Sequence, residues 1–369
     1  MLGDGVNSMK ILIVRYKYYF DRDWNKLGVQ TGSALLDDCL RAFAAPRGHT
    51  VDVFFFDDMI LHYGRDVARQ KLWEYISTQK PDVCMAGFHE FDWGKEILEK
   101  MRDQKFTTFV YIGDDDTWRW ERVSRHFAKY FHWIVTYDSR AVEKYHSIGC
   151  KNVIHHQPGA NIHSFKRVEG LEKDIDVNFI GLWSKPRARV VNVLRKAGID
   201  VFARGFGWPE GSISQEELIN VMSRTKIVLA LNTPSFYIGW RSIARLFFRH
   251  AYLGEGGSPI KLDIQNFPDN VRSWLMKRNL WVKARNFEVP ACGAFEMTED
   301  ADDLRDYFKI GEEIVVYKGD KDLVEKVRFY LGHPEEREAI AKRGYERTIR
   351  DHSIERRYED IFKMIGKPL

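Results

Sequence analysis

The sequence predicts an α/β protein made of two tandem Rossmann-like domains, each with a parallel sheet. Short apolar runs alternate with stretches of helical periodicity, and this alternation stops at the charged residues 166–176 and then restarts. Strands that alternate with helices form parallel sheets covered on both faces. The chain has 369 residues, which is enough for two domains of ordinary size.

The first domain is expected over residues 9–165, because MKILIV at 9–14 reads as a natural start and residues 1–8 as an extension. Its predicted strands are apolar or β-branched runs at 10–14, 51–56, 82–88, 107–112, 133–137 and 152–156. Helical periodicity separates these runs at 33–43, 64–79, 93–102, 118–130 and 139–148.

The second domain is expected over residues 176–350. Its predicted strands lie at 177–182, 199–203, 226–231, 294–297 and 312–317, and its helices at 187–197, 215–223, 321–331 and 334–350. An inserted segment at 233–279 is rich in Trp, Phe and Arg, and so long a connection between core strands is typically functional. The last helix, within 351–369, is expected to pack back on the first domain. Two such domains would face each other across a cleft.

Composition excludes several classes of protein. The chain carries 57 basic and 53 acidic residues, a net charge of +4, and no run of 18 apolar residues that could span a bilayer. No secretory signal is recognisable, and the cysteines form no CxxC pair, so we expect free thiols in a reducing cytoplasm. The cysteines are Cys39, Cys84, Cys150 and Cys292.

A glycine-containing turn precedes the first predicted helix of the first domain. Gly28, Thr31 and Gly32 lack the GxGxxG spacing of a dinucleotide fingerprint, which disfavours NAD. We expect Gly32 to contact a phosphate or a sugar hydroxyl at the helix N-terminus. The alternative is a plain turn that begins a helix.

Two polar clusters follow the third and fourth predicted strands. His89 stands beside acidic residues, where an imidazole could act as general base, and Asp115 lies in a run of three aspartates that could bind hydroxyls or a metal. Alternatively, Asp116 caps the next helix and His89 bonds the backbone. The three histidines of HHQPGANIH lack the spacing of a zinc site, so we predict no metal there.

The second domain contains two candidate anion-binding segments. Lys185, Arg187 and Arg189 surround a helix start, where the dipole alone disfavours cations, so a bound diphosphate would explain them. The alternative is a solvated basic patch. In KARNFEVPACGAFEMTED, Lys283 and Arg285 precede Glu288, whose carboxylate in an apolar setting needs donors such as ribose hydroxyls.

These residues carry a resemblance to a known family. RNFEVPACGAFEMTED, followed by EEIVVY, HPEEREAIAKRGYERT and HSIERR, resembles the C-terminal domain of CgeB-like glycosyltransferases, which are group 1 type enzymes of the GT-B fold with the signature E-x7-E followed by ACG. The resemblance implies that Glu288 is the second glutamate and binds the ribose of the donor. The first glutamate would fall at Leu280, where this chain departs from the signature.

The resemblance also implies the other donor contacts. Arg285, with Lys283 and Asn286, would lie near the diphosphate and sugar, and Lys185 and Arg187 would grip the diphosphate. Gly293 of the ACG triplet would let the backbone turn sharply where the ligand passes.

The implied function is transfer of a sugar from a nucleotide-diphosphate donor to an acceptor bound mainly by the first domain, without a cofactor or a metal. Retention of configuration is favoured, with the leaving phosphate as base; inversion would need a base such as His89 or Asp115. Arg285 would stabilise the leaving group. Two alternatives stay open: a degenerate domain that binds a sugar nucleotide or a partner without turnover, because of Leu280, and a nucleotide-sugar epimerase.

The acceptor and the oligomeric state stay open. A glycan, a lipid-linked acceptor, a protein and a nucleic acid are all compatible with the sequence. The aromatic and basic residues 235–257 could contact a membrane surface or a polyanion, and the alternative is a packing arm or a dimer contact.

Overall fold

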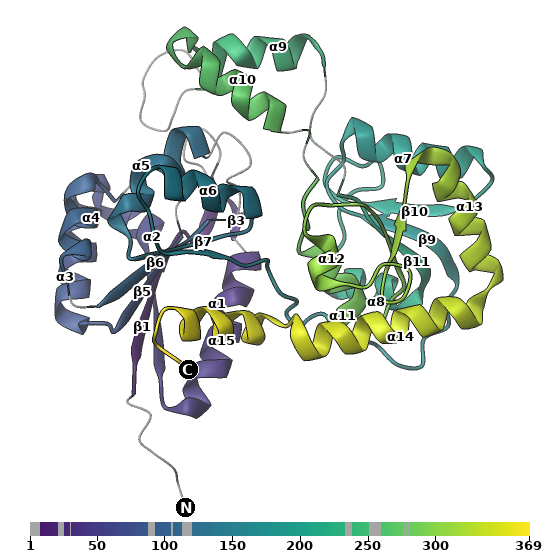
Figure 1. Cartoon of the computed structure of the whole chain (residues 1–369), viewed down its shortest axis with the longest axis horizontal. Helices are drawn as coiled ribbons and strands as arrows, with labels where there is room; N and C mark the ends of the chain where they lie inside the picture. Colours follow the sequence, from purple (N-terminus) through teal and green to yellow (C-terminus); the bar gives the residue numbers. More distant parts are fainter. Residues whose placement is uncertain are drawn as a thin grey trace, which may run out of the picture. The chain divides into compact units, whose positions relative to one another are not determined.

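The computed structural model describes residues 8–20, 26–29, 31–87, 93–104, 106–112, 120–232, 238–250, 260–276, 278 and 280–369. The chain divides into two compact units (Figure 1). Unit 1 comprises Met1–His156, Phe236–Lys277 and Tyr358–Leu369, and unit 2 comprises Gln157–Ser235 and Arg278–Arg357.

Unit 1 contains a six-stranded parallel sheet of order β4-β1-β5-β6-β7-β8. The strands are β1 Lys10–Arg15, β4 Thr50–Phe55, β5 Val83–Gly87, β6 Thr107–Ile112, β7 Trp133–Thr136 and β8 Val153–His155. Five consecutive residues of β1 are buried because both faces of a parallel sheet are covered by helices. The strands predicted from the apolar runs are therefore confirmed as a sheet.

The helices of unit 1 cover both faces of this sheet, with α3 and α4 on one side and α1 on the other (Figure 1). They are α1 Thr31–Ala44, α2 Phe56–Tyr63, α3 Arg65–Gln79, α4 Lys95–Arg102 and α6 Ser139–Ser147. The helix predicted at 118–130 is irregular in its described part, a π-helical turn at Trp120–Ser124 followed by α5 Arg125–Phe127 and a 3-10 turn at Ala128–Tyr130. A short hairpin, β2 Tyr18–Phe20 and β3 Lys26–Val29, follows β1.

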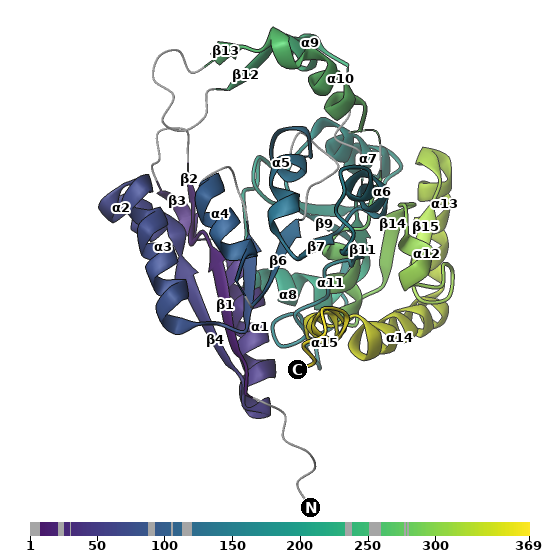
Figure 2. The same ribbon diagram turned by 60° about the vertical axis from the view of Figure 1, so that its left-hand side comes forward.

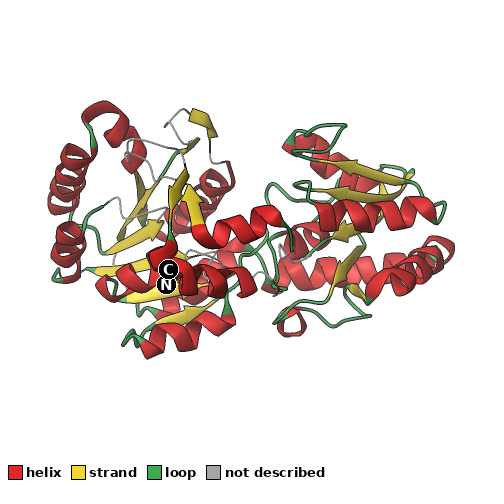
Figure 3. Ribbon diagram, turned by 90° about the horizontal axis from the view of Figure 1, so that it is seen from above, coloured by secondary structure: helices red, strands yellow, loops and turns green. Residues whose placement is uncertain are grey.

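Unit 2 contains a five-stranded parallel sheet of order β10-β9-β11-β14-β15. The strands are β9 Ile175–Ile180, β10 Val201–Arg204, β11 Thr225–Ala230, β14 Glu296–Glu299 and β15 Val315–Tyr317. The helices are α7 Lys185–Lys196, α8 Gln215–Arg224, α11 Arg285–Ala291, α12 Leu304–Tyr307, α13 Gly319–Gly332 and α14 Pro334–Asp351. They lie on both faces of the sheet (Figure 3), and one buried apolar cluster fills each side.

The inserted segment belongs to unit 1, whereas we expected it in the second domain. Its elements are α9 Trp240–Phe247, β12 Phe248–His250, β13 Ile260–Leu262, a 3-10 turn at Ile264–Asn266 and α10 Phe267–Met276. Asp269 of α10 pairs with Arg125 of α5 at 3.3 Å, and Lys144 of α6 approaches the sulfur of Met276 at 3.8 Å. These contacts join segments far apart in the sequence, which explains the difference.

The last helix, α15 Ile354–Met364, contributes its second half to unit 1. The ring of Phe362 meets that of Phe109 of β6 at 5.9 Å, edge to face, and the Tyr358 hydroxyl donates to the Leu36 carbonyl at 3.4 Å. The structure thus places this part of the helix against the sheet of unit 1.

The end of the first domain also differs from the expected residue 165. Residues Gln157 onward belong to unit 2, where Ala160 forms a β-bridge with Ser353. A side chain at Gly159 would overlap the backbone of Ser353, so the two segments pass in close contact. The four cysteines are buried free thiols, as expected. Within the described residues, no helix is both long and apolar enough to cross a membrane.

Candidate functional site

The predicted site residues fall into three groups. His89 and Asp115 lie outside the described residues. Gly32 lies in unit 1, in the first turn of α1. The other residues, which the sequence assigned to the donor, all lie in unit 2: Lys185, Arg187, Lys283, Arg285, Asn286, Glu288 and Gly293.

Two loops at the carboxyl ends of β9 and β10 run side by side. Gly181 N–H donates to the Arg204 carbonyl at 3.0 Å, and Trp183 N–H donates to the Phe206 carbonyl at 2.9 Å. Gly205 has φ +134°, and a Cβ there would overlap the Gly181 carbonyl. Only glycine therefore permits this approach. The carboxyl ends of the strands in an open α/β sheet are where ligands bind.

Arg187 lies in the first turn of α7 and hydrogen-bonds the loop that follows β9. Ser184 caps this helix by accepting from Arg187 N–H at 3.4 Å. The Arg187 guanidinium donates to the carbonyl of Leu182 at 2.9 Å and, more weakly, to that of Leu231 at 3.4 Å. Burial lowers the pKa of Arg187, and the positive charge of Arg285 lowers it further while the Glu299 carboxylate opposes both effects.

Arg285 and Glu288 form an ion pair one turn apart on α11. Arg285 Nη1 lies 3.2 Å from Glu288 Oε2, and their side chains are 27% and 19% exposed. Nη1 is buried, yet it makes no hydrogen bond of normal geometry within the described part of the chain. A partly buried guanidinium with a spare donor is suited to a further anionic ligand.

Arg187 and Arg285 are thus two cations that act on each other electrostatically while partly removed from water. Like charges placed together in this way are unfavourable unless an anion compensates them. Glu299 and Glu288 compensate part of this charge in the protein itself. Lys185, the first residue of α7, is exposed, and Lys283, in the turn before α11, is half-buried.

Asn286 belongs to the frame of the site. It is 0% exposed, and its Oδ1 accepts from Lys283 N–H at 2.9 Å. Its Nδ2 donates to Glu296 Oε1 at 2.6 Å and to Thr298 Oγ1 at 3.2 Å. A side chain with this burial and these partners holds the turn before α11 against β14, whereas the sequence suggested contact with the donor.

Gly293 also has a structural explanation. Its φ is +67°, and a Cβ would stand 3.1 Å from Cδ of Arg167, whose side chain covers this turn. The glycine therefore permits a left-handed turn beneath Arg167, whereas we expected a turn beside the ligand. Burial raises the pKa of the preceding Cys292 to about 12, with the Glu288 carboxylate contributing in the same direction.

Sequence reasoning missed Glu296, a fully buried carboxyl group on β14. Burial raises its pKa well above the ordinary value, and the donor Asn286 and the charge of Arg285 oppose this only in part. Its Oε2 has no hydrogen-bond partner within the described residues. Glu288 and Glu296 are separated by seven residues, so the E-x7-E spacing could have drawn attention to it.

Two exposed aromatic side chains at the same sheet edge were also missed. Trp183 is 40% exposed and Phe206 is 76% exposed, and they lie on the two hydrogen-bonded loops described above. Exposed rings beside cations offer a flat apolar surface to a base or a sugar. Their positions directly after strands β9 and β10 would have been the signal.

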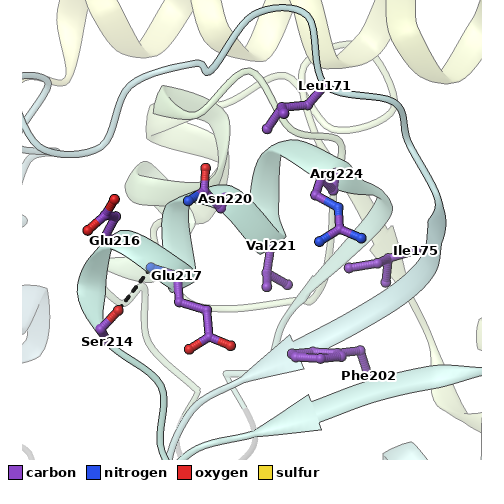
Figure 4. A pocket seen from close by; sticks show the side chains of 9 residues that line it. All are labelled: Leu171, Ile175, Phe202, Ser214, Glu216, Glu217, Asn220, Val221 and Arg224. Atoms are coloured by element: carbon purple, nitrogen blue, oxygen red, sulfur yellow. Dashed lines mark hydrogen bonds between the residues drawn. The ribbon is translucent and has the colours of Figure 1, made fainter.

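A cavity of ≈ 670 Å³ lies elsewhere in unit 2, beside α8 and the start of β9 (Figure 4). Glu216 and Glu217 line it, and Ser214 caps α8 there by accepting from Glu217 N–H at 3.1 Å. Carboxylates would repel a diphosphate, so this cavity does not suit a nucleotide donor. No group of three or more His, Cys, Asp or Glu side chains among the described residues could hold a metal ion.

In sequence, the chain is similar to known proteins over part of its length. Residues 266–363 match the family model described as glycosyl transferase-like. A segment of 72 residues is 36% identical to the spore protein CgeB of Bacillus subtilis (strain 168). This segment is 20% of the present chain and spans about a fifth of the relative, 21% of its length.

Solved structures match nearly the whole chain in fold. Anabaena Alr3699/HepE, crystallised with UDP and glucose, has a TM-score of 0.57 and 11% identity and covers 97% of this chain and 99% of its own. A glycosyltransferase from Rickettsia africae ESF-5 has a TM-score of 0.60 and 11% identity, covering 98% and 99%. Sucrose-phosphate synthase from Thermosynechococcus elongatus has a TM-score of 0.59 and 11% identity, covering 97% and 99%.

These similarities concern two different properties of the chain. The structural neighbours, all at low identity, share its fold of two parallel-sheet α/β units, which is the GT-B fold. The family match covers residues 266–363 alone, and the solved structures, at 11% identity, bear on the fold. The expected resemblance to CgeB-like group 1 glycosyltransferases is therefore confirmed, in sequence over residues 266–363 and in fold over nearly the whole chain.

Proposed function

We propose that this protein transfers a sugar from a nucleotide-diphosphate donor to an acceptor. The observation that carries the proposal is the pair Arg187 and Arg285, two partly desolvated guanidinium groups that act on each other in unit 2. A diphosphate would compensate both charges. The structural neighbour HepE was crystallised with UDP-glucose, which supports this class of donor.

The chemistry follows from where negative charge develops. Cleavage of a sugar–phosphate bond leaves an additional negative charge on the diphosphate and gives the sugar oxocarbenium character. Fixed cations in a site of low dielectric stabilise that charge more strongly than water does. Arg187 and Arg285 would supply this stabilisation, with Lys185 and Lys283 beside them, so the proposal needs no metal ion.

Glu288 would hold the ribose. A carboxylate accepts hydrogen bonds from two vicinal hydroxyl groups, and the ion pair with Arg285 fixes the orientation of Glu288. Trp183 and Phe206 would offer exposed rings to the base or the sugar. Asn286 and Glu296 would hold the turn before α11 against β14 without contacting the ligand.

We infer retention of configuration, in which the leaving phosphate takes the proton of the acceptor. An inverting reaction would instead need a carboxylate or imidazole base, for which His89 and Asp115 are the candidates. The acceptor is proposed to bind unit 1.

The experiment measures hydrolysis and transfer with labelled UDP- and GDP-sugars. Arg285→Ala and Arg187→Ala should each lower turnover by about 10²–10³-fold, the usual effect of removing one donor to a developing anion. Arg189→Ala is the matched control, because Arg189 lies on the same helix, is 69% exposed and pairs with Asp320. Normal turnover in the Arg187 and Arg285 variants would contradict the proposal.

A second candidate function, binding of a sugar nucleotide without turnover, is favoured by one observation. The position of the first glutamate of the signature is Leu280, which packs against the apolar cluster that contains Phe287. This reading predicts that nucleotides raise the unfolding temperature while no labelled donor is consumed.

A further inference from the structure

The inserted segment exposes an unusual amount of apolar surface. Nine of the nineteen large hydrophobic side chains that the described residues expose lie within 238–250 and 260–276, and each is between 38% and 75% exposed. Scattered single side chains of this kind are ordinary on a protein surface, but a gathered set marks an interaction site. Figure 2 shows the elements that carry them, α9 and α10 with the ribbon β12–β13.

One face of α9 carries three of these nine side chains. Trp240, Ile243 and Phe247 are spaced three and four residues apart and are 75%, 47% and 38% exposed. Ser242, on the other side of the helix, is buried and hydrogen-bonds the Gly239 backbone. Trp240 and Ile243 on the apolar face of this amphipathic helix are thus turned to solvent, whereas the ring of Phe247 stacks on that of Phe267 of α10 at 5.0 Å.

The adjoining ribbon continues the apolar face. In the antiparallel pair β12–β13, Phe248 stands opposite Leu262 and Arg249 stands opposite Lys261. Because side chains alternate between the faces of a strand, one face carries Phe248, Leu262 and Ile260, and the other carries the two cations. Phe248, Leu262 and Ile260 are 44%, 62% and 51% exposed.

The charge of the segment is positive, and its acidic groups are neutralised within the protein. Residues 238–250 and 260–276 contain five Arg or Lys and two Asp, a net charge of +3. Asp263 is 0% exposed and lies 3.8 Å from Arg249. Asp269 is shared between Arg125 at 3.3 Å and Arg272 at 2.9 Å.

Two exposed arginines lie on α9, Arg241 next to Trp240 and Arg245 on the side opposite the apolar face. Arg241 and Arg245 are exposed, and the Arg241 guanidinium stands 5.2 Å from the centre of the Trp240 ring. Interfacial helices combine Trp, Phe and aliphatic residues on one face with Lys or Arg beside it. The apolar side chains enter the acyl boundary, and the cations meet anionic headgroups.

We propose that the segment formed by 238–250 and 260–276 docks on the surface of a membrane that contains anionic phospholipids. This goes beyond glycosyl transfer, because it assigns a second, separate binding surface. The chemistry favours a bilayer over the other occupants: a nucleic acid would use the cations but not exposed Ile and Leu side chains, and a second protein would not require the exposed arginines of α9.

The experiment is flotation of the full chain with vesicles of phosphatidylcholine alone or of phosphatidylcholine with phosphatidylglycerol. We expect binding to the anionic vesicles that weakens with salt. The double variant Trp240→Ser/Ile243→Ser removes the apolar face, and Arg241→Glu/Arg245→Glu removes the cations. Each should weaken binding by at least about tenfold, since one cation near an anionic surface contributes roughly a fivefold change.

The control variants change exposed residues elsewhere in the chain. Leu61→Ser alters a 38% exposed side chain of α2, and Lys342→Glu reverses a 74% exposed charge on α14. Both should bind vesicles like the unmodified chain, and all variants should bind UDP or GDP alike, so this proposal can fail independently of the proposed function. Circular dichroism confirms that the variants are folded.

Four results would overturn the proposal. The first is no binding to either vesicle type, and the second is equal binding by the double variants. The third is a dimer in light scattering that Trp240→Ser/Ile243→Ser dissociates while vesicles have no effect, which would assign the surface to a second copy of the chain. Binding of a polyanion that ignores the apolar variant, without vesicle binding, would likewise assign it to a nucleic acid.

Discussion

Replacing Asn286 by alanine tests whether this residue holds the frame of the site or contacts the donor. Its side chain makes three hydrogen bonds, to Lys283, Glu296 and Thr298, and none of its surface is exposed. Thr298 keeps other partners, because its hydroxyl donates to Ala230 at 2.6 Å and accepts from Asn232 at 3.0 Å. Glu296 would keep no such hydrogen-bond partner, because its Oε2 already has none among the described residues.

The expected loss of stability follows from this count. Each net hydrogen bond contributes about 1 kcal/mol, and a buried acceptor left without its donor costs about 1–3 kcal/mol more. The Asn286→Ala change should therefore lower the free energy of unfolding by about 4–6 kcal/mol. For a unit of the size of unit 2, each kcal/mol shifts Tm by about 2–4 °C, which gives a decrease of roughly 8–24 °C.

The assay is thermal and urea unfolding followed by circular dichroism, with Asn220→Ala as control, a change of the same type on the half-buried surface of α8. The control should shift the free energy of unfolding by less than about 0.5 kcal/mol. Below its Tm, Asn286→Ala should still bind the donor nucleotide. An unchanged Tm together with lost nucleotide binding would refute the structural role and make Asn286 a ligand of the donor.

Three further predictions concern stability in unit 2. The pKa of Glu296 is raised in the folded state, so this carboxyl group destabilises the fold as the pH rises above its ordinary pKa of 4.5. Between pH 4.5 and neutrality, Glu296→Gln should therefore gain stability relative to the unmodified chain in urea titrations. A stability difference that stays constant with pH would contradict this. His352 has its pKa lowered by burial to about 4, so stability should fall by about 3 kcal/mol as pH decreases from 6.5 to 4, and His352→Gln should flatten that dependence. Gly205→Ala should lower Tm and weaken nucleotide binding, because the added Cβ overlaps the Gly181 carbonyl. Normal nucleotide binding by this variant would show that the loop is not part of the donor site.

The two sheets could be predicted from the sequence because parallel strands leave a continuous apolar signal. The runs at 10–14 and 226–231 coincide with β1 and β11, which are buried on both faces. The run at 294–297 was placed two residues early relative to β14. Ala294 and Phe295 are buried but precede the strand, and the polar Thr298 and Glu299, with which β14 ends, gave no apolar signal.

The candidate site was only partly accessible to sequence reasoning. The i,i+3 spacing of Arg285 and Glu288 is local, so the ion pair follows from the helix that carries them. The burial of Asn286 and the packing of Arg167 over Gly293 arise from tertiary contacts, which periodicity does not report. The same reason explains the inserted segment, whose place in unit 1 depends on the pair Arg125 and Asp269.

The most direct test of the account is a crystal structure with UDP or GDP bound. The account predicts the diphosphate within hydrogen-bond distance of the guanidinium groups of Arg187 and Arg285, and a ribose hydroxyl donating to the Glu288 carboxylate. A nucleotide seated away from both arginines, or one whose ribose meets other side chains while Glu288 stays paired with Arg285 alone, would contradict it.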